Sequence, residues 1–205
     1  MERVVLVPVK SFADAKARLA PLLSPAYRER LARWMAERVL AAAGELPVFV
    51  ACDNDGVAEW AAAHGATVLW HPGVGLNAAV NNSLSDLRAR GLDHVVVAHG
   101  DLPRARLLEN TIIPGTLTLV PDVHGDGTNV IAMPTSLAFE FAYGAGSFRR
   151  HLAQAIAVGL PVAVCRDPLL GIDIDTPSDL THPLVQEVLP TWLPTNPANH
   201  SPARA

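Results

Sequence analysis

The sequence has little that would indicate a secreted, membrane-bound or zinc-stabilised protein. Its 205 residues include 2 cysteines, Cys52 and Cys165, which are too far apart for the close pairs of zinc sites and redox motifs. Both lie in apolar runs, so we expect buried free thiols in a reducing compartment. The N-terminus lacks the features of a signal peptide, and no stretch approaches the roughly 18 unbroken apolar residues of a membrane span. These absences predict a cytoplasmic protein with no membrane partner.

A basic excess is also missing. The chain has 16 Lys and Arg against 20 Asp and Glu, a formal net charge of -4, whereas nucleic-acid-binding domains are normally basic. The composition therefore argues against nucleic acid as a partner, and any anion site must be local. Half of the residues are hydrophobic, which is typical of a folded globular domain, and the length suits one substantial core.

Histidine and serine motifs of hydrolytic enzymes are absent as well. The chain has no H-E-x-x-H and no G-x-S-x-G elbow, the spacings expected of a zinc protease or an α/β-hydrolase. We interpret the histidines in four separate segments as incidental or loop residues rather than zinc ligands; these are His71, His99, His124 and His151.

Strand and helix patterns alternate along the chain. β-branched apolar runs predict strands, and apolar residues at helical spacing between capping residues and glycines predict helices. The predicted strands are 3–8, 47–52, 66–70, 94–98, 116–122, 128–134 and 161–165, and the predicted helices are 25–44, 55–65, 75–91, 147–159 and a short one after 176. This order predicts a single-domain, Rossmann-like α/β fold over residues 1–188, with a mostly parallel sheet and helices on both faces. Residues 189–205, rich in Pro and Asn, predict a flexible C-terminal tail.

The first predicted strand is followed at once by a loop with three cations, Lys10, Lys16 and Arg18. The carboxyl end of a strand in an open α/β sheet is where such folds bind ligands. Three cations there favour an anion, most often a phosphate. A solvated basic loop remains the alternative from these residues alone.

Three aspartates occupy the predicted ends of extended segments. Asp101 ends the apolar run of the fourth strand, while Asp173 and Asp175 alternate around Ile174. On an extended chain both of the latter carboxylates face one way, with Cα atoms about 6.5 to 7 Å apart. Two like charges so placed need compensation, and Mg²⁺ favours carboxylate oxygen, water and phosphate. The alternative is that Asp173 is solvated and Asp175 caps a helix that begins at Pro177.

Two glycine-rich stretches come later in the chain. Residues 124–130, HGDGTNV, suit a hairpin turn, although the glycines and Thr128 would also let donors approach an anion. In YGAGSF, Gly144 and Gly146 precede Ser147, which we expect to cap a helix. A glycine loop that opens into a helix N-terminus favours an anion site, although it matches no standard nucleotide fingerprint.

Taken in order, these segments resemble the guanylyltransferases that act on phosphorylated three-carbon acids in the biosynthesis of the deazaflavin coenzyme F-420. The resemblance covers residues 4–180 and rests on PVKSFADAKARL, GLNAAV, GDLP, PDVHGDGTNV, YGAGSF and DIDTPSDL. It implies a nucleotidyltransferase domain of the glycosyltransferase-A type that uses GTP and Mg²⁺. The acid would be phosphoenolpyruvate, which we favour, or 2-phospho-L-lactate or 3-phosphoglycerate, with the product passed to the next enzyme of the pathway. The oligomeric state stays open, with a homodimer as one option.

Carried over residue by residue, the resemblance implies a role for each matching position. The metal ligands would be Asp101, Asp173 and Asp175; the phosphorylated acid would contact Thr128, Gly144 and Ser147; the catalytic cations at the GTP phosphates would be Lys10, Lys16 and Arg18; and Gly75, Leu76 and Asn77 would lie on the nucleotide side.

Two other function classes compete with this interpretation. Molybdenum-cofactor and sugar-phosphate nucleotidyltransferases carry a first loop of the L-x-G-G-x-S-x-R kind, whereas this chain has PVKSFADAK there. A non-catalytic nucleotide-binding module would not need an acidic trio, and Asp101, Asp173 and Asp175 are all present. Both observations favour the guanylyltransferase.

Overall fold

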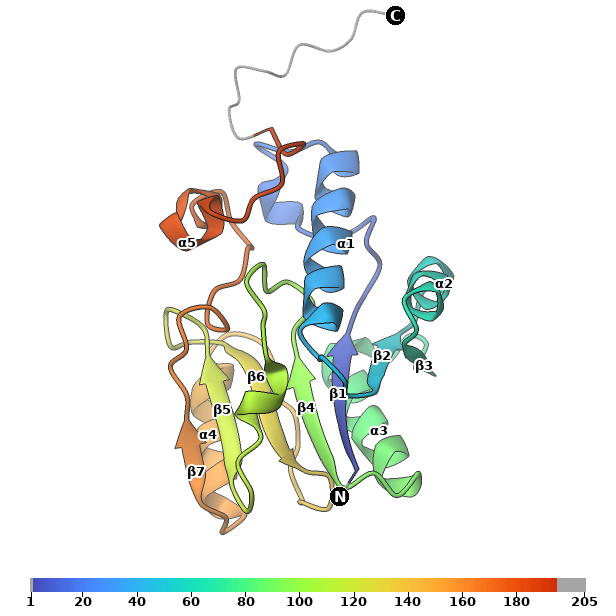
Figure 1. Cartoon of the computed structure of the whole chain (residues 1–205), viewed down its shortest axis with the longest axis vertical. Helices are drawn as coiled ribbons and strands as arrows, with labels where there is room; N and C mark the ends of the chain where they lie inside the picture. The colour runs from blue at the N-terminus through green and yellow to red at the C-terminus, as the bar shows by residue number, and fades with distance from the viewer. Residues whose placement is uncertain (1, 195–205) are drawn as a thin grey trace, which may run out of the picture.

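A seven-stranded sheet with the order β3-β2-β1-β4-β6-β5-β7 runs through the computed structural model, which describes residues 2–194 (Figure 1). β6 is antiparallel to both of its neighbours, and the other pairs are parallel. The strands are β1 (Arg3–Pro8), β2 (Val48–Cys52), β3 (Thr67–Trp70), β4 (His94–Ala98), β5 (Leu117–Pro121), β6 (Thr128–Pro134) and β7 (Val162–Val164). The mostly parallel sheet predicted from the alternating pattern is confirmed.

The first two helices begin at capping side chains. The hydroxyl of Ser24 accepts a hydrogen bond from the Tyr27 N–H (3.4 Å), and the Asn54 side chain accepts one from the Val57 N–H (3.2 Å), which satisfies donors that a helix start leaves free. The helices are α1 (Pro25–Ala41), α2 (Asp55–Ala63), α3 (Gly75–Ala89), α4 (Ser147–Ala157) and α5 (Pro183–Gln186), with 3-10 turns η1 (Ala17–Leu19), η2 (Leu108–Thr111) and η3 (Asp179–Thr181).

The two faces of the sheet have separate cores. Successive side chains of a strand point to opposite faces, so Val5 and Val7 of β1 pack toward α1 and α2, while Val4 and Leu6 pack toward α3 and α4. All four are fully buried. Burial on both faces explains why the strands are apolar runs rather than alternating ones.

A third core holds the first loop against the end of the chain. Leu19 of η1 and Leu31 of α1 pack with Ile172 and Ile174, which are buried on either side of Asp173. Because of this packing, the segment that contains Asp173 and Asp175 lies next to the segment that contains Lys16 and Arg18. The two stretches lie more than 150 positions apart in the sequence, and the third core is what brings them to one place.

The same core also covers the first part of the predicted tail. Leu193 is 5% exposed, and the ring of Trp192 stacks on Tyr27 with centroids 6.5 Å apart. Residues 189–194 are therefore packed against α1, because these apolar side chains bury surface that composition alone does not reveal. The rest of the predicted tail, 195–205, lies outside the described residues.

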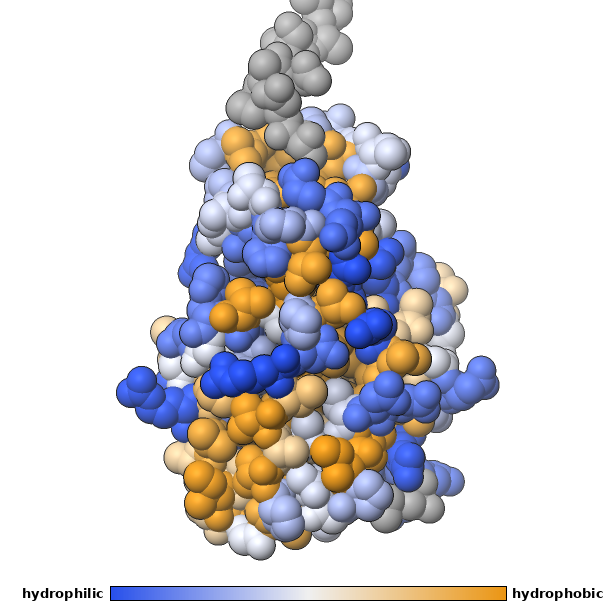
Figure 2. Space-filling view, turned by 60° about the vertical axis from the view of Figure 1, so that its left-hand side comes forward, coloured by the Kyte–Doolittle hydropathy of each residue, from blue (hydrophilic) through white to orange (hydrophobic). Residues whose placement is uncertain are grey.

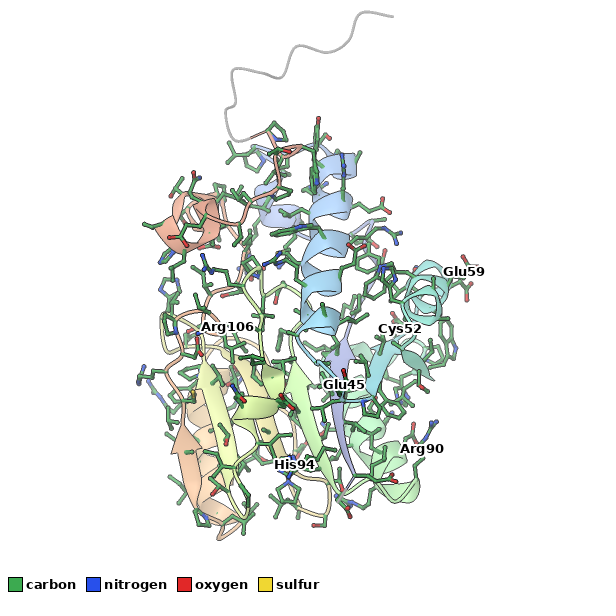
Figure 3. The ribbon with its side chains drawn as sticks, in the orientation of Figure 1. Glu45, Cys52, Glu59, Arg90, His94 and Arg106 are labelled. Atoms are coloured by element: carbon green, nitrogen blue, oxygen red, sulfur yellow. The ribbon has the colours of Figure 1, made fainter. Side chains whose placement is uncertain are left out.

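Other predictions from composition can be compared with the structure directly. Cys52 lies at the end of β2 (Figure 3) and is buried, Cys165 is partly buried, and both are free thiols. Between residues 2 and 194, no helix is long and apolar enough to cross a membrane.

On the side of the molecule that carries β7, apolar side chains gather over the lower part of the surface (Figure 2). Ile156 of α4 and Val164 of β7 are exposed at 65% and 40%.

Candidate active site

Three carboxylates meet at the carboxyl end of the sheet. Asp101 follows β4, and Asp173 and Asp175 come from the segment after β7; one oxygen from each lies within 4.8 Å of the others. The Ile174 N–H, which donates to the Asp101 carbonyl oxygen (3.4 Å), joins the two segments. The structure therefore brings together the three side chains that were predicted to hold a metal.

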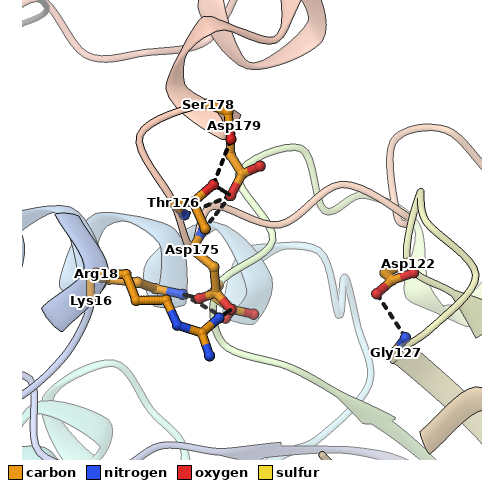
Figure 4. A network of polar contacts seen from close by, with 9 residues as sticks. Lys16, Arg18, Asp122, Gly127, Asp175, Thr176, Ser178 and Asp179 are labelled. Atoms are coloured by element: carbon orange, nitrogen blue, oxygen red, sulfur yellow. Dashed lines mark hydrogen bonds and ion pairs between the residues drawn. The ribbon is translucent and has the colours of Figure 1, made fainter. Parts of the chain in front are cut away.

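An ammonium group lies between two of these aspartates. The Nζ atom of Lys16 is 2.6 Å from Oδ2 of Asp101, and the Lys16 side chain is 8% exposed. The same Nζ atom is 2.7 Å from Oδ1 of Asp175 (Figure 4). Burial opposes the charge, but the two carboxylates outweigh it and raise the pKa of Lys16. The Lys16 backbone has φ 56°, a left-handed conformation that residues with a Cβ seldom adopt and that is often found at functional sites. The space between the carboxylates thus accepts a cation.

The remaining carboxyl of the trio is in a different electrostatic state. Burial, together with the charges of Asp101 and Asp175, raises the pKa of Asp173 to about 7. Burial also favours a raised pKa of Asp101. The charge of the Lys16 ammonium and its hydrogen bond oppose burial, however, and the pKa of Asp101 stays below its ordinary value. Among residues 2–194, Asp173 has no ion-pair partner. The trio therefore has more negative charge than Lys16 neutralises.

The alternative role of Asp175 as a helix cap is wrong. It is Asp179 that accepts hydrogen bonds from the N–H groups of Asp175 (2.9 Å) and Thr176 (2.7 Å) and from the Thr176 hydroxyl (2.9 Å) (Figure 4). The Asp175 carboxylate turns instead to Lys16 and to Arg18, whose Nη1 lies 4.0 Å from Oδ2.

Two cavities meet at this cluster. We call the cavity lined by the first loop the first-loop cavity, and the cavity lined by residues 143–147 the glycine-loop cavity; their volumes are about 310 and 410 Å³. The first-loop cavity is lined in part by Pro8, Val9, Phe12, Met35, Lys10 and Lys16. The glycine-loop cavity is lined in part by Arg18, Asp126, Thr128, Asn129, Tyr143, Gly144, Ser147 and Asp173. Leu76, His99, Asp101 and Asp175 line both, so a molecule in either cavity reaches the carboxylates.

The three predicted cations do not stay together. Lys10 and Lys16 line the first-loop cavity, whereas Arg18 lines the glycine-loop cavity and has a side chain that is 76% exposed. Residue 16 is the only one of the three that forms short ion pairs within the described part of the chain. The three cations were predicted to face one ligand, but the structure divides them between the two cavities.

The N-terminus of α3 carries the residues predicted on the nucleotide side. Leu76 lines both cavities, and Gly75, with φ 76°, begins the helix beside the first loop. The amide of Asn77 has another partner: its Oδ1 accepts from the Tyr143 N–H (2.7 Å) and its Nδ2 donates to the Tyr143 carbonyl oxygen (3.2 Å). Asn77 therefore holds the backbone that leads into the glycine loop, which differs from the role that the resemblance implies.

The residues predicted to contact the phosphorylated acid come together at the glycine-loop cavity. Ser147 is the first residue of α4 and is 2% exposed, with no hydrogen-bond partner for its hydroxyl within residues 2–194. The expected cap is wrong, because Gly146 takes the N-cap position with φ 70°. The Gly146 N–H donates to Oδ2 of Asp126 (3.0 Å), which ties the β5–β6 hairpin to the glycine loop. Thr128, Gly144 and Ser147 thus face one cavity.

Sequence reasoning missed two histidines of this region. His99 follows β4, is buried with its pKa lowered by that burial, and meets the Tyr143 ring edge-on at 4.5 Å. His151 of α4 is 0% exposed and lies beside Thr128. The interpretation as incidental or loop residues fits His99, which lies in the loop after β4, and is wrong for His151, which is buried in α4. Their partners lie in other segments, so no local spacing could have identified them.

The fold and the site together define a class of protein. A solved nucleotidyl transferase of Methanothermobacter thermautotrophicus has the same fold, with a TM-score of 0.60 and 17% identity over 88% of this chain and 94% of that one. In this chain such a fold places clustered carboxylates between two cavities that carry cations and hydroxyl donors. The chain thus has the fold of a nucleotidyl transferase, with an acidic cluster where two cavities meet.

The comparison of sequences identifies the family. Residues 3–186 match the model described as guanylyl transferase CofC like, and the chain belongs to this family. It is 38% identical over 190 residues to the phosphoenolpyruvate guanylyltransferase of Sphaerobacter thermophilus, covering 88% of this chain and 91% of that one. It is 30% identical over 191 residues to the 2-phospho-L-lactate guanylyltransferase of Methanothermobacter thermautotrophicus, covering 88% and 83%. The predicted resemblance is confirmed.

Proposed function

We propose that the enzyme transfers GMP from GTP to the phosphate of a phosphorylated three-carbon acid, with phosphoenolpyruvate favoured, and releases pyrophosphate. One observation carries the proposal: two cavities of different chemistry share the carboxylates of Asp101 and Asp175. A reaction that joins two anionic substrates needs such a meeting point. The names of the two relatives support the choice of substrates.

The first-loop cavity suits the nucleotide. Its apolar wall includes Val9 and Leu76, which are partly exposed and offer surface for a flat base. Its cations Lys10 and Lys16 offer charge for the phosphates. The N-terminus of α3 opens nearby at Gly75, and a helix N-terminus favours an anion.

The glycine-loop cavity suits the phosphorylated acid. Thr128 and Ser147 line it together with Gly144, whose φ of 119° lies in the region that favours glycine. Arg18 lines the same cavity. Hydroxyl donors and an arginine match the phosphate and carboxylate of a small acid.

We propose Mg²⁺ as the cofactor, held by Asp101, Asp173 and Asp175. Three carboxylates suit a hard divalent cation, and the position of the Lys16 ammonium between two of them supports a cation there. The raised pKa of Asp173, caused by burial and by the neighbouring carboxylates, fits a site with room for further positive charge. When bound, the metal would neutralise charge on the phosphates.

In the proposed reaction a phosphate oxygen of the acid forms a bond to the α-phosphorus of GTP. The bond from that phosphorus to the oxygen bridging to the β-phosphate breaks, and pyrophosphate leaves with its electron pair. The attacking phosphate is already ionised at neutral pH, so no side chain has to remove a proton. The protein contributes positioning and charge neutralisation, with Lys10, Lys16 and Arg18 as the cations nearest the cavities.

The setting of the enzyme follows from the same proposal. The product would pass to the next enzyme of deazaflavin coenzyme F-420 biosynthesis, in the cytoplasm. A homodimer is the proposed assembly, and light scattering after gel filtration tests it: twice the mass of one chain supports the dimer, and a single mass contradicts it.

A pyrophosphate-release assay tests the function. Purified enzyme with Mg²⁺ and GTP is offered phosphoenolpyruvate, 2-phospho-L-lactate or 3-phosphoglycerate separately, with Asp173→Asn as the background control. We expect the highest kcat/KM with phosphoenolpyruvate, and at least a tenfold preference for GTP over ATP, about 1.4 kcal/mol of transition-state binding. No release with any acid would contradict the function, and equal efficiency with ATP would contradict the nucleotide.

A further inference from the structure

His151 lies among buried aromatic rings and next to Thr128, a residue that lines the glycine-loop cavity. The imidazole is 0% exposed. Its centroid lies 5.0 Å from the Tyr143 ring, 5.7 Å from the Phe139 ring and 6.4 Å from the Phe141 ring. A polar ring in such a place is costly unless both nitrogen atoms have partners.

Both nitrogen atoms of His151 have partners, and these define its tautomer. Nε2 lies 2.9 Å from the backbone nitrogen of Ala142. Because a backbone N–H can only donate, Nε2 is the acceptor and carries no proton. The proton of the neutral ring is therefore on Nδ1. Burial and the charge of Arg150 lower the pKa of His151 to about 4, so the ring is neutral at physiological pH.

The Nδ1 proton determines what the Thr128 hydroxyl can do. Nδ1 lies 3.0 Å from Oγ1 of Thr128, so that oxygen accepts a hydrogen bond from the ring. Its own hydrogen must then point elsewhere. Within residues 2–194 no acceptor of that hydrogen is present, and Thr128 lines the glycine-loop cavity. The hydroxyl thus presents a donor toward the cavity.

We propose that His151 is a positioning residue, which orients the Thr128 hydroxyl as a hydrogen-bond donor to the phosphorylated acid. The inference rests on the proposed function, because it assumes that the acid lies in the glycine-loop cavity. His151 acts only through Thr128 and does not itself line that cavity. A hydroxyl that is free to rotate would accept or donate according to its surroundings, and the fixed imidazole removes that choice in favour of an anionic substrate.

The competing role is purely structural. The bond from the Ala142 N–H to Nε2 holds the segment before the glycine loop, and it would justify a buried histidine without any effect through Thr128. The two bonds of the ring can be separated by substitution. An asparagine amide reaches the position of Nδ1, whereas a glutamine amide reaches the position of Nε2. His151→Asn thus keeps the donor to Thr128, and His151→Gln keeps the acceptor for Ala142.

The matched pair of variants gives opposite expectations under the two roles. If His151 positions Thr128, His151→Gln raises the KM for phosphoenolpyruvate by about tenfold or more, the effect of losing a hydrogen bond to a charged group. His151→Asn leaves that KM within about threefold of the wild-type value. The KM for GTP changes in neither variant. If the role is structural, His151→Asn is the more damaging change, and that outcome overturns the inference.

Thr128→Val completes the test as a double-mutant cycle. Because His151 acts through the hydroxyl, His151→Gln should cause no further loss in the Thr128→Val background; additive losses overturn the inference. If Thr128→Val alone leaves the KM for the acid unchanged, the proposed acid site is wrong. A raised KM in Thr128→Val with no rise in His151→Gln leaves the proposed acid site intact and overturns the positioning role.

Melting temperatures show which variants fold. If His151→Gln does not fold, His151→Asn decides: an unchanged KM supports the role and a tenfold rise refutes it.

Discussion

Replacing Asp173 by asparagine should make the metal-free protein more stable and the enzyme inactive. The carboxyl of Asp173 has a pKa raised to about 7 by burial and by the charges of Asp101 and Asp175. At pH 8 it is ionised in the folded and in the unfolded chain, and in the folded chain this ionisation is unfavourable. Asparagine keeps the shape of the side chain and removes that charge.

The size of the effect follows from the shift of the pKa. Moving from the ordinary value of 3.8 to about 7 corresponds to about 4 kcal/mol. Solvent screening at a partly exposed site reduces this to about 2 kcal/mol. For a chain of this length that free energy raises the melting temperature by roughly 4 to 8 °C.

The dependence on pH has a definite sign. Between pH 4 and 7 the folded wild-type protein keeps a proton on Asp173 that the unfolded chain has lost. The free energy of unfolding contributed by this group therefore falls as pH rises through that window, and is level above it. The stabilisation in Asp173→Asn should accordingly be largest at pH 8 and should vanish toward pH 4.

Thermal denaturation with EDTA, at several pH values, measures the effect. Glu59→Gln is the matched control, because this substitution also removes one negative charge, but at an exposed position on α2 (Figure 3). In a second series, Mg²⁺ should raise the melting temperature of the wild type more than that of Asp173→Asn, and turnover of the variant should fall at least a hundredfold. A variant no more stable than Glu59→Gln at pH 8 would refute the electrostatic reasoning. Full turnover at saturating Mg²⁺ would refute the role as a metal ligand.

Two further substitutions separate the halves of the site. Ser147→Ala should raise the KM for phosphoenolpyruvate roughly ten- to a hundredfold and leave the KM for GTP unchanged. Steady-state kinetics with each substrate varied in turn measure the two KM values. If both KM values stayed at the wild-type value, the prediction would be contradicted. The melting temperature should stay close to that of the wild type, because Gly146 rather than Ser147 is the N-cap of α4. Lys16→Met leaves Asp101 and Asp175 without their ammonium partner, so the metal-free protein should lose about 1 to 3 kcal/mol of stability. Mg²⁺ should raise the melting temperature of Lys16→Met more than that of the wild type, and equal increments would show that Lys16 does not share a site with the metal.

Local patterns account for what could be predicted of the fold. Each strand is a run of apolar residues and each long helix has periodic apolar positions, and both signals lie within about a dozen neighbouring residues. The segment 189–194 was assigned to a tail because its composition is rich in proline. Its packing against Tyr27 depends on a contact with a residue more than 150 positions earlier.

The sequence by itself determined the fold class, the family and the acidic trio, because those depend on short motifs in a given order. Tertiary structure alone decided the contacts of the functional side chains. Lys16 meets Asp101 and Asp175 across separations of 85 and 159 residues. Asn77 holds Tyr143 across 66 residues, and His151 meets Thr128 across 23. No sequence spacing encodes such pairs, since they exist only once the third core and the aromatic group around His151 have packed.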